Sequence, residues 1–140
     1  MYLLDTETAA ELRKASMRRG DQSLRDWAGS VDVKDVYLSA ITLQELEMGV
    51  RLSERDDPKR GAVLRDWMSR QVLHHLSARV LPINTAIALK AAELHGQRAR
   101  TLSHAFIAAT ASVQGLSVVT RKVASFSDMG VSIVNPWQAQ

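Results

Sequence analysis

The chain of 140 residues contains no cysteine, which excludes disulfide bonds, thiolate metal sites and a cysteine nucleophile. Aromatic residues make up only 5% of the sequence and apolar residues 46%, so a core built mainly from aliphatic side chains is expected. No apolar run approaches the roughly 18 residues that a membrane-spanning helix needs. Asp5 interrupts the apolar N-terminus, so no signal peptide is expected. These absences favour a cytoplasmic protein without a membrane partner.

Acidic residues are scarce in the second half of the chain. Residues 71–140 contain six Lys or Arg and only two acids, Glu93 and Asp128, although the net charge of the whole chain is just +3. A basic surface of this kind admits a polyanionic partner such as RNA. A solvated surface without any partner is the alternative.

Several enzyme signatures are also missing. The sequence has neither a GxGxxG nor a GxxxxGK[ST] loop for nucleotide phosphates. It has no HExxH zinc motif and no GxSxG nucleophile elbow. Dinucleotide-dependent enzymes, P-loop enzymes and serine hydrolases are therefore not supported.

Short apolar segments alternate with helix-forming segments, which is typical of an α/β domain around a parallel sheet. The length of the chain fits a single domain over residues 1–140. We expect strands at residues 2–4, 36–40, 79–83, 117–120 and 131–134. We expect helices at residues 7–15, 23–29, from 42, from 58, at 86–94 and at 103–113.

Three helix starts have clear sequence signals. Thr42 and Glu45 have the spacing of a capping box, in which a Thr N-cap is followed three residues later by Glu. Asp57 precedes a proline, which suits the first position of a helix. Asn84 is the expected cap of the helix over residues 86–94.

Polar residues gather where the predicted strands end. In open α/β sheets the ligand site lies beyond the carboxyl ends of the strands. The polar residues expected at those ends, and at the helix starts beside them, are Asp5, Thr6, Ser39, Glu45, Asn84, His104, Thr120 and Arg121.

Three of these residues have both a structural and a functional interpretation. Asp5 either caps the following helix or presents a carboxylate to the site. Glu45 either completes the capping box or binds a cation, and the two roles can coexist. His104 stands in the first turn of a helix, where the helix dipole favours the neutral imidazole that can bind metal. The alternative is a hydrogen-bonded or partly exposed histidine.

Several segments taken together resemble one protein family. They are Met1-Tyr2-Leu3-Leu4-Asp5-Thr6 with Glu11-Leu12, residues 37–46 with Gly49, Val80-Leu81-Pro82-Ile83, residues 106–111, Val119-Thr120-Arg121 and Val134-Asn135-Pro136-Trp137. In this order the sequence resembles the PIN-domain toxins of the VapC/FitB type. The match runs from residue 1 to residue 137.

The resemblance implies a three-layer α/β/α domain with a central parallel sheet of about five strands. It implies a ribonuclease that depends on Mg2+ or Mn2+ and is the toxin of a toxin–antitoxin pair. It also implies a homodimer and a cognate antitoxin whose tail fills the active-site groove. Operator DNA would be bound only through the antitoxin.

The acidic cluster of the family is matched only in part. Asp5 and Glu45 correspond to the first two acids, and His104 stands where the third is usual. At the two positions where the fourth acid is found, this sequence has Lys122 and Ser125. A histidine in place of a carboxylate softens the site, which favours manganese or another transition metal over magnesium. Glu7, in place of a usual Asn, and Glu47 are the candidates for a compensating carboxylate.

The expected roles follow from this comparison. Asp5, Glu45 and His104 would hold the metal and form the catalytic group. Thr6, Thr120, Arg121 and Lys122 would bind substrate, and Arg98 and Arg100 could contact the RNA backbone. One alternative is a relative with weakened or lost nuclease activity that still binds antitoxin or RNA. A receiver-like domain is disfavoured, because it needs an Asp after the third strand and the sequence has Ile83-Asn84 there.

Overall fold

Five short apolar segments form the parallel sheet of this computed structural model, which describes residues 1–16, 19–96 and 101–138. The strands are β1 (Tyr2–Leu4), β2 (Val36–Ser39), β3 (Val80–Leu81), β4 (Ser117–Val119) and β5 (Ile133–Val134). Their order is β3-β2-β1-β4-β5, with every neighbouring pair parallel. Strands buried on both faces consist of near-continuous apolar residues. Leu3 and Leu4 are accordingly only 0% and 2% exposed.

Helices connect the strands as the sequence pattern predicts. They are α1 (Thr6–Ser16), α2 (Gln22–Ser30), α3 (Ala40–Asp56), α4 (Pro58–Trp67), α5 (His74–Leu76), α6 (Thr85–Gly96) and α7 (Leu102–Gln114). A π-helical segment, Met68–Leu73, joins α4 to α5, and 3-10 turns lie at Val33–Asp35, Ser77–Arg79 and Val123–Ser125. Within the described ranges, no helix has the length and apolar character needed to cross a bilayer.

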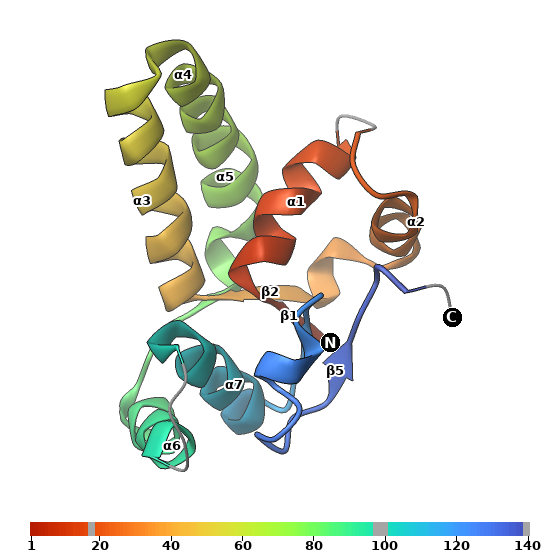
Figure 1. Ribbon diagram of the computed structural model, residues 1–140, viewed down its shortest axis with the longest axis vertical. Coiled ribbons are helices and arrows are strands. Elements are labelled where there is room, and N and C mark those ends of the chain that lie inside the picture. Colours follow the sequence, from red (N-terminus) through yellow and green to blue (C-terminus); the bar gives the residue numbers. More distant parts are fainter. Residues whose placement is uncertain (17–18, 97–100, 139–140) are drawn as a thin grey trace.

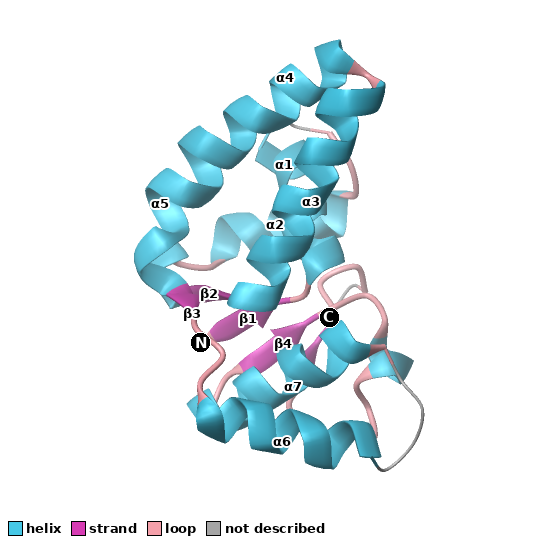
Figure 2. Ribbon diagram, turned by 90° about the vertical axis from the view of Figure 1, so that its left-hand side faces the viewer, coloured by secondary structure: helices cyan, strands magenta, loops and turns pink. Residues whose placement is uncertain are grey.

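The helices cover the two faces of the sheet in separate layers (Figures 1 and 2). Leu3 and Val118 point to one face, where they pack with α6 and α7. Leu4, Leu38 and Val119 point to the other face, where they pack with α1, α3 and the π-helical segment. This alternation follows from the period of two in a β-strand. The expected α/β/α arrangement with a five-stranded parallel sheet is confirmed.

The helix caps confirm two of the three sequence signals. Asp57 accepts a hydrogen bond from the Arg60 backbone at the start of α4, and Asn84 accepts one from Ile87 in α6. The third prediction is wrong, because Ser39 and not Thr42 caps α3, through its hydroxyl oxygen and the Ile41 N–H. Helix α3 begins directly after β2, so Thr42 lies inside it and Glu45 is free of the predicted capping role.

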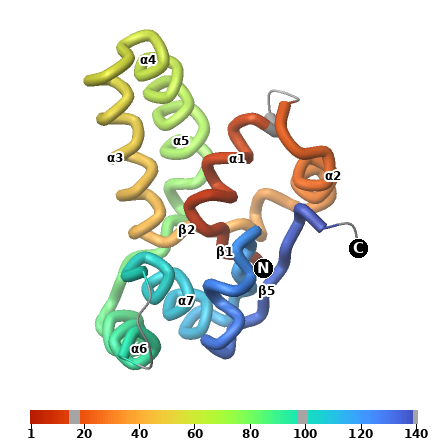
Figure 3. The backbone as a smooth tube through the Cα atoms, in the orientation of Figure 1, coloured from red at the N-terminus to blue at the C-terminus, as the bar shows by residue number. Residues whose placement is uncertain are grey.

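Helices α3 and α4 form an antiparallel hairpin that extends away from the sheet (Figure 3). Gly61 of α4 lies against the backbone of Glu54 in α3, a contact that leaves no room for a Cβ atom. Arg65 of α4 donates to both oxygens of Glu47, at 2.7 and 3.0 Å, and to Glu54 at 2.8 Å. Arg51 also pairs with Glu47, so the hairpin combines one close backbone approach with a four-residue ion-pair network.

The Arg65 network predicts a stability difference that depends on pH. Hydrogen bonds from Arg65 hold the pKa of Glu47 and of Glu54 below the ordinary value of 4.5. Carboxylates with a lowered folded-state pKa stabilise the fold above the ordinary pKa and lose that contribution as the pH falls through the lowered value. We expect Arg65→Met to lower the melting temperature at pH 7, and the difference from the native chain to shrink below about pH 4.5. Thermal unfolding between pH 3 and pH 7 measures this. A difference that stays constant over that range would contradict the network's role.

Candidate active site

The strand order creates a crevice beside the carboxyl ends of β1 and β4. The chain passes from β1 to β2 on one side, while β4 lies on the other side, so this is the point where the direction of winding changes and ligand sites form. Asp5 directly follows β1, and Thr120 directly follows β4. A cavity of about 430 Å³ opens there. It is lined by Asp5, Thr6, Glu7, Glu45, Thr101, Ser103, His104, Ile107 and Lys122.

Asp5 has both of the roles considered from the sequence. Its Oδ1 accepts a hydrogen bond from the Thr8 N–H at 2.9 Å, and its carbonyl accepts one from Ala9, so it caps α1. Its Oδ2 accepts a hydrogen bond of 2.6 Å from the Thr120 hydroxyl. The residue is 3% exposed, yet it lines the cavity. A carboxylate has about four acceptor positions, so these contacts orient Asp5 and leave acceptor capacity.

Thr120, expected to bind substrate, connects two other residues of the site. Its side chain is fully buried, its hydroxyl donates to Asp5, and its oxygen accepts from the backbone N–H of Lys122. These contacts support a positioning role for Thr120. They also connect the Lys122 backbone to the Asp5 carboxylate through one side chain.

Glu45 enters the cavity from the second turn of α3. Its Oε1 accepts a hydrogen bond of 2.6 Å from the Thr6 hydroxyl in the first turn of α1. The Thr6 oxygen also lies 3.3 Å from the Thr42 hydroxyl. Thr6, expected to bind substrate, therefore positions the second carboxylate as Thr120 positions the first.

His104 lines the same cavity from the first turn of α7. Its ring packs against buried Phe126, with the ring centroids 5.1 Å apart. The sequence predicted His104 at this site but gave no signal for Phe126, which lies 22 positions further along the chain. Thr101 and Ser103 were also missed, although polar residues at the start of α7 could have indicated them.

Of the two basic residues after β4, Lys122 lines this cavity, and the Glu7 carboxylate lies between it and Arg121. Lys122 Nζ lies 3.6 Å from one oxygen of Glu7, and Arg121 Nη1 lies 3.5 Å from the other. The Arg121 guanidinium also lies 4.8 Å from the centre of the Trp137 ring, in a cation–π contact. Arg98 and Arg100 lie outside the described residues.

The other candidate for a compensating carboxylate lies elsewhere. Glu47 belongs to the α3–α4 hairpin, where Arg65 occupies both of its oxygens. Its proposed part in the site is therefore not supported. Glu7 does line the cavity, and so does Lys122 at one position of the absent fourth acid.

The donor set suits a hard divalent cation in part. Among residues 1–16, 19–96 and 101–138, no three His, Asp or Glu side chains converge closely enough to hold a metal ion. Asp5 and Glu45 nevertheless line one cavity, each held by a threonine hydroxyl and each with unused acceptor positions. Magnesium is commonly held by one or two carboxylates, with water and substrate phosphate completing its shell. Two oriented carboxylates in one cavity fit that mode of binding.

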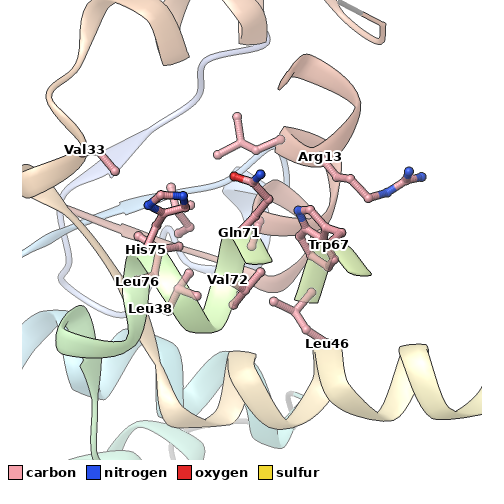
Figure 4. A pocket seen from close by; sticks show the side chains of 12 residues that line it. Arg13, Val33, Leu38, Leu46, Trp67, Gln71, Val72, His75 and Leu76 are labelled. Atoms are coloured by element: carbon pink, nitrogen blue, oxygen red, sulfur yellow. The ribbon is translucent and has the colours of Figure 1, made fainter. Parts of the chain in front are cut away.

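One further hollow adjoins the cavity, and a second adjoins the first. The first, of about 340 Å³ between α1 and the α3–α4 hairpin, shares Thr6 and Glu45 with the cavity. The second, of about 230 Å³, shares Arg13, Leu46 and Trp67 with the first and is mainly apolar, as Figure 4 shows. We call this series of three hollows, linked by shared lining residues, the groove.

Comparison with known proteins supports a family assignment. The family model described as PIN domain matches residues 2–128. "VapC ribonuclease Y4jK" of Sinorhizobium fredii is 34% identical over 99% of each chain. "Toxin FitB" of Neisseria gonorrhoeae is 33% identical over 98% of this chain and 99% of its own length. The structure titled "Crystal Structure of FitAcB from Neisseria gonorrhoeae" superposes with a TM-score of 0.88 at 31% identity, over 99% of this chain and 100% of that one. Sequence and fold agree over almost the whole length, and the chain belongs to the PIN-domain family.

Proposed function

We propose that this chain is the toxin of a toxin–antitoxin pair and acts as a ribonuclease that requires a divalent metal. The observation that carries this proposal is the pair of carboxylates, Asp5 and Glu45, held by threonine hydroxyls in one cavity at the switch point of the sheet. Relatives of similar length are named as a VapC ribonuclease and a toxin. The strand-end position of the cavity agrees with the general place of ligand sites in open α/β sheets.

The side chains have distinct tasks in phosphodiester hydrolysis. Asp5 and Glu45 would hold the cation, either Mg2+ or Mn2+, which when bound polarises the phosphoryl group and makes a water more acidic. Thr120 and Thr6 keep the two carboxylates in place. Arg121 and Lys122 present positive charge to the RNA backbone. His104 lines the same cavity, and its contribution to metal binding is testable by substitution.

Cleavage of labelled RNA by the purified protein tests the proposal. We expect cleavage with Mn2+ and weaker cleavage with Mg2+, because His104 lines the cavity at a position where the family resemblance implies a hard carboxylate oxygen. A chelator should abolish both reactions. Cleavage that continues in the chelator, or its absence with every divalent ion tried, would contradict a metal-dependent ribonuclease.

One observation favours a weakened enzyme as the second candidate. By the family resemblance, His104 stands at the position of the third acid, and Lys122 and Ser125 stand at the two positions where the fourth is found, so fewer negative groups would surround the cation. We expect His104→Asp to raise both Mn2+ affinity and metal-dependent cleavage, by roughly tenfold for a gain near 1.4 kcal/mol. An aspartate in the first turn of α7 also suits the positive end of the helix dipole, so the fold should tolerate it.

A double variant is the control for the gain expected from His104→Asp. Asp5→Asn combined with His104→Asp should remove the gain, because the added acid acts through the cation that Asp5 shares. If the native chain cleaves fast and His104→Asp slows it, the histidine is an adapted part of an efficient site, and the weakened-site candidate is wrong.

We also propose a cognate antitoxin as the main protein partner. The groove from the apolar pocket to the cavity could seat an apolar helix followed by a chain segment that reaches the carboxylates. A related structure is titled "Structure of FitAB bound to IR36 DNA fragment", which supports DNA binding of the assembly through the antitoxin. A homodimer and a cytoplasmic place of action, where RNA substrates occur, complete the proposal.

A further inference from the structure

Glu7, which lines the acidic cavity, pairs with two cations, Lys122 of the same cavity and the neighbouring Arg121. It lies in the first turn of α1 and uses one oxygen toward Arg121, at 3.5 Å, and the other toward Lys122, at 3.6 Å. The side chains of both cations are more than half exposed, at 53% and 57%, whereas Glu7 is 30% exposed. One carboxylate therefore faces two exposed cations with its two oxygens, as two oxygens of a phosphodiester could.

The two cations are held in place by contacts that do not involve Glu7. The Arg121 guanidinium lies over the Trp137 ring, 4.8 Å from its centre. The Lys122 backbone N–H donates to the Thr120 hydroxyl, which in turn donates to Asp5. The Arg121 side chain and the Lys122 backbone are thus held just beyond the end of β4, where the Thr120 hydroxyl connects them to Asp5, by contacts that do not depend on Glu7.

The ion pairs of Glu7 are long for charged groups. Hydrogen bonds between a cationic nitrogen and a carboxylate oxygen are commonly about 2.7–2.9 Å, and both distances here exceed that range. Exposed pairs of this kind contribute little to folding stability. A ligand with a phosphate charge can therefore compete for Arg121 and Lys122 at small cost to the fold.

We propose that Glu7 competes with RNA by occupying, in the free protein, the position between Arg121 and Lys122 that a phosphate would take. An RNA phosphodiester must displace its carboxylate to reach the cavity. The inference rests on the proposed function, since it takes RNA as the ligand. It goes beyond that function because it assigns to Glu7 the task of weakening RNA binding, whereas the same residue as a metal-binding acid would strengthen the active site.

Binding of a short fluorescein-labelled single-stranded RNA, measured by anisotropy in EDTA, tests the proposal without cleavage. We expect Glu7→Gln to bind the RNA about three- to tenfold more tightly than the native chain, because two cations lose an exposed competing anion. The dependence of log K on log salt should become steeper by roughly 0.7 for each cation that gains a phosphate. Arg121→Ala with Lys122→Ala in the Glu7→Gln background should return the affinity to the native level or below.

Glu93→Gln is the matched control. It changes the net charge by the same amount and breaks a 3.5 Å ion pair with Lys90 on α6, away from the residues that line the cavity. We expect its RNA affinity to stay within about twofold of the native chain. An affinity of Glu7→Gln no higher than that of Glu93→Gln would overturn the proposal, as would a gain that survives removal of both cations.

A parallel cleavage assay with Mn2+ separates this inference from the proposed function. A native chain that fails to cleave RNA contradicts the ribonuclease, while the binding comparison in EDTA still decides the role of Glu7. If Glu7→Gln lowers Mn2+ affinity and leaves RNA binding in EDTA unchanged, Glu7 serves the cation, and the competitor role is wrong.

Discussion

Gly61→Ala should destabilise the protein by about 3 kcal/mol, the upper part of the range for forced overpacking. A Cβ atom at this position would lie 2.4 Å from the Cα atom of Glu54 and 2.6 Å from its backbone nitrogen. Backbone atoms cannot rotate aside as the end of a side chain can, so α3 and α4 would have to separate. Their separation would also stretch the Arg65 bonds to Glu47 and Glu54. Urea unfolding followed by circular dichroism measures the loss.

Gly49→Ala is the matched control for this effect. Gly49 lies inside α3, and a Cβ atom there would meet nothing within 4 Å. Alanine in an exposed helix interior is more favourable than glycine by roughly 0.5–1 kcal/mol, so we expect this variant to be slightly more stable. An unfolding midpoint of Gly61→Ala equal to that of the native chain would show that the hairpin is not held by this contact.

Asp5→Asn should reduce metal-dependent RNA cleavage by at least about a hundredfold, since the cation supplies several kcal/mol of transition-state stabilisation. The amide oxygen can still accept the Thr8 N–H, because Asn caps helices about as well as Asp. The substitution removes one negative charge from the cavity, which Glu7 and Glu45 also line, with little change in the size of the side chain. Cleavage rates with Mn2+ and melting temperatures of both proteins measure the two effects.

Asp21→Asn is the control for the capping role of Asp5. Asp21 caps α2 by accepting a hydrogen bond from the Leu24 N–H at 3.0 Å, the same three-residue geometry that joins Asp5 to Thr8. We expect Asp21→Asn to cleave RNA at the native rate. Equal loss of activity in both variants would assign the effect to helix capping, and an unchanged rate in Asp5→Asn would remove Asp5 from the catalytic group.

Local patterns in the sequence predicted the parallel α/β sheet and the strand-end position of the site, and the family resemblance implied the three layers. The position of Asp5 could be predicted because a residue directly after a buried parallel strand lies at the carboxyl end of that strand, where ligand sites form. Thr42 was misplaced as a cap because Ser39, three residues earlier, already satisfies the start of α3. Which of the two residues caps the helix depends on where β2 ends, and the spacing of Thr42 and Glu45 does not determine the end of that strand.

The partners of the site residues could not be predicted from the sequence. Thr120 and Asp5 are 115 positions apart, Thr6 and Glu45 are 39 apart, and no local pattern reports such pairs. The partner of Glu47 was equally unpredictable. Glu47 lies two positions after Glu45 in the sequence, but its carboxylate accepts hydrogen bonds from Arg65, 18 positions along the chain. These pairings became visible only from the hydrogen bonds between different helices and strands in the structure.

Manganese binding measured by electron paramagnetic resonance tests most directly whether Asp5 and Glu45 together hold a catalytic cation. The free Mn2+ signal is titrated with the native chain, with Asp5→Asn/Glu45→Gln and with Asp21→Asn as the control. We expect one bound Mn2+ per native chain, the same for the control, and loss of that site in the double variant. Equal Mn2+ binding by the native chain and the double variant, or no binding by the native chain at millimolar Mn2+, would contradict a cation held by Asp5 and Glu45.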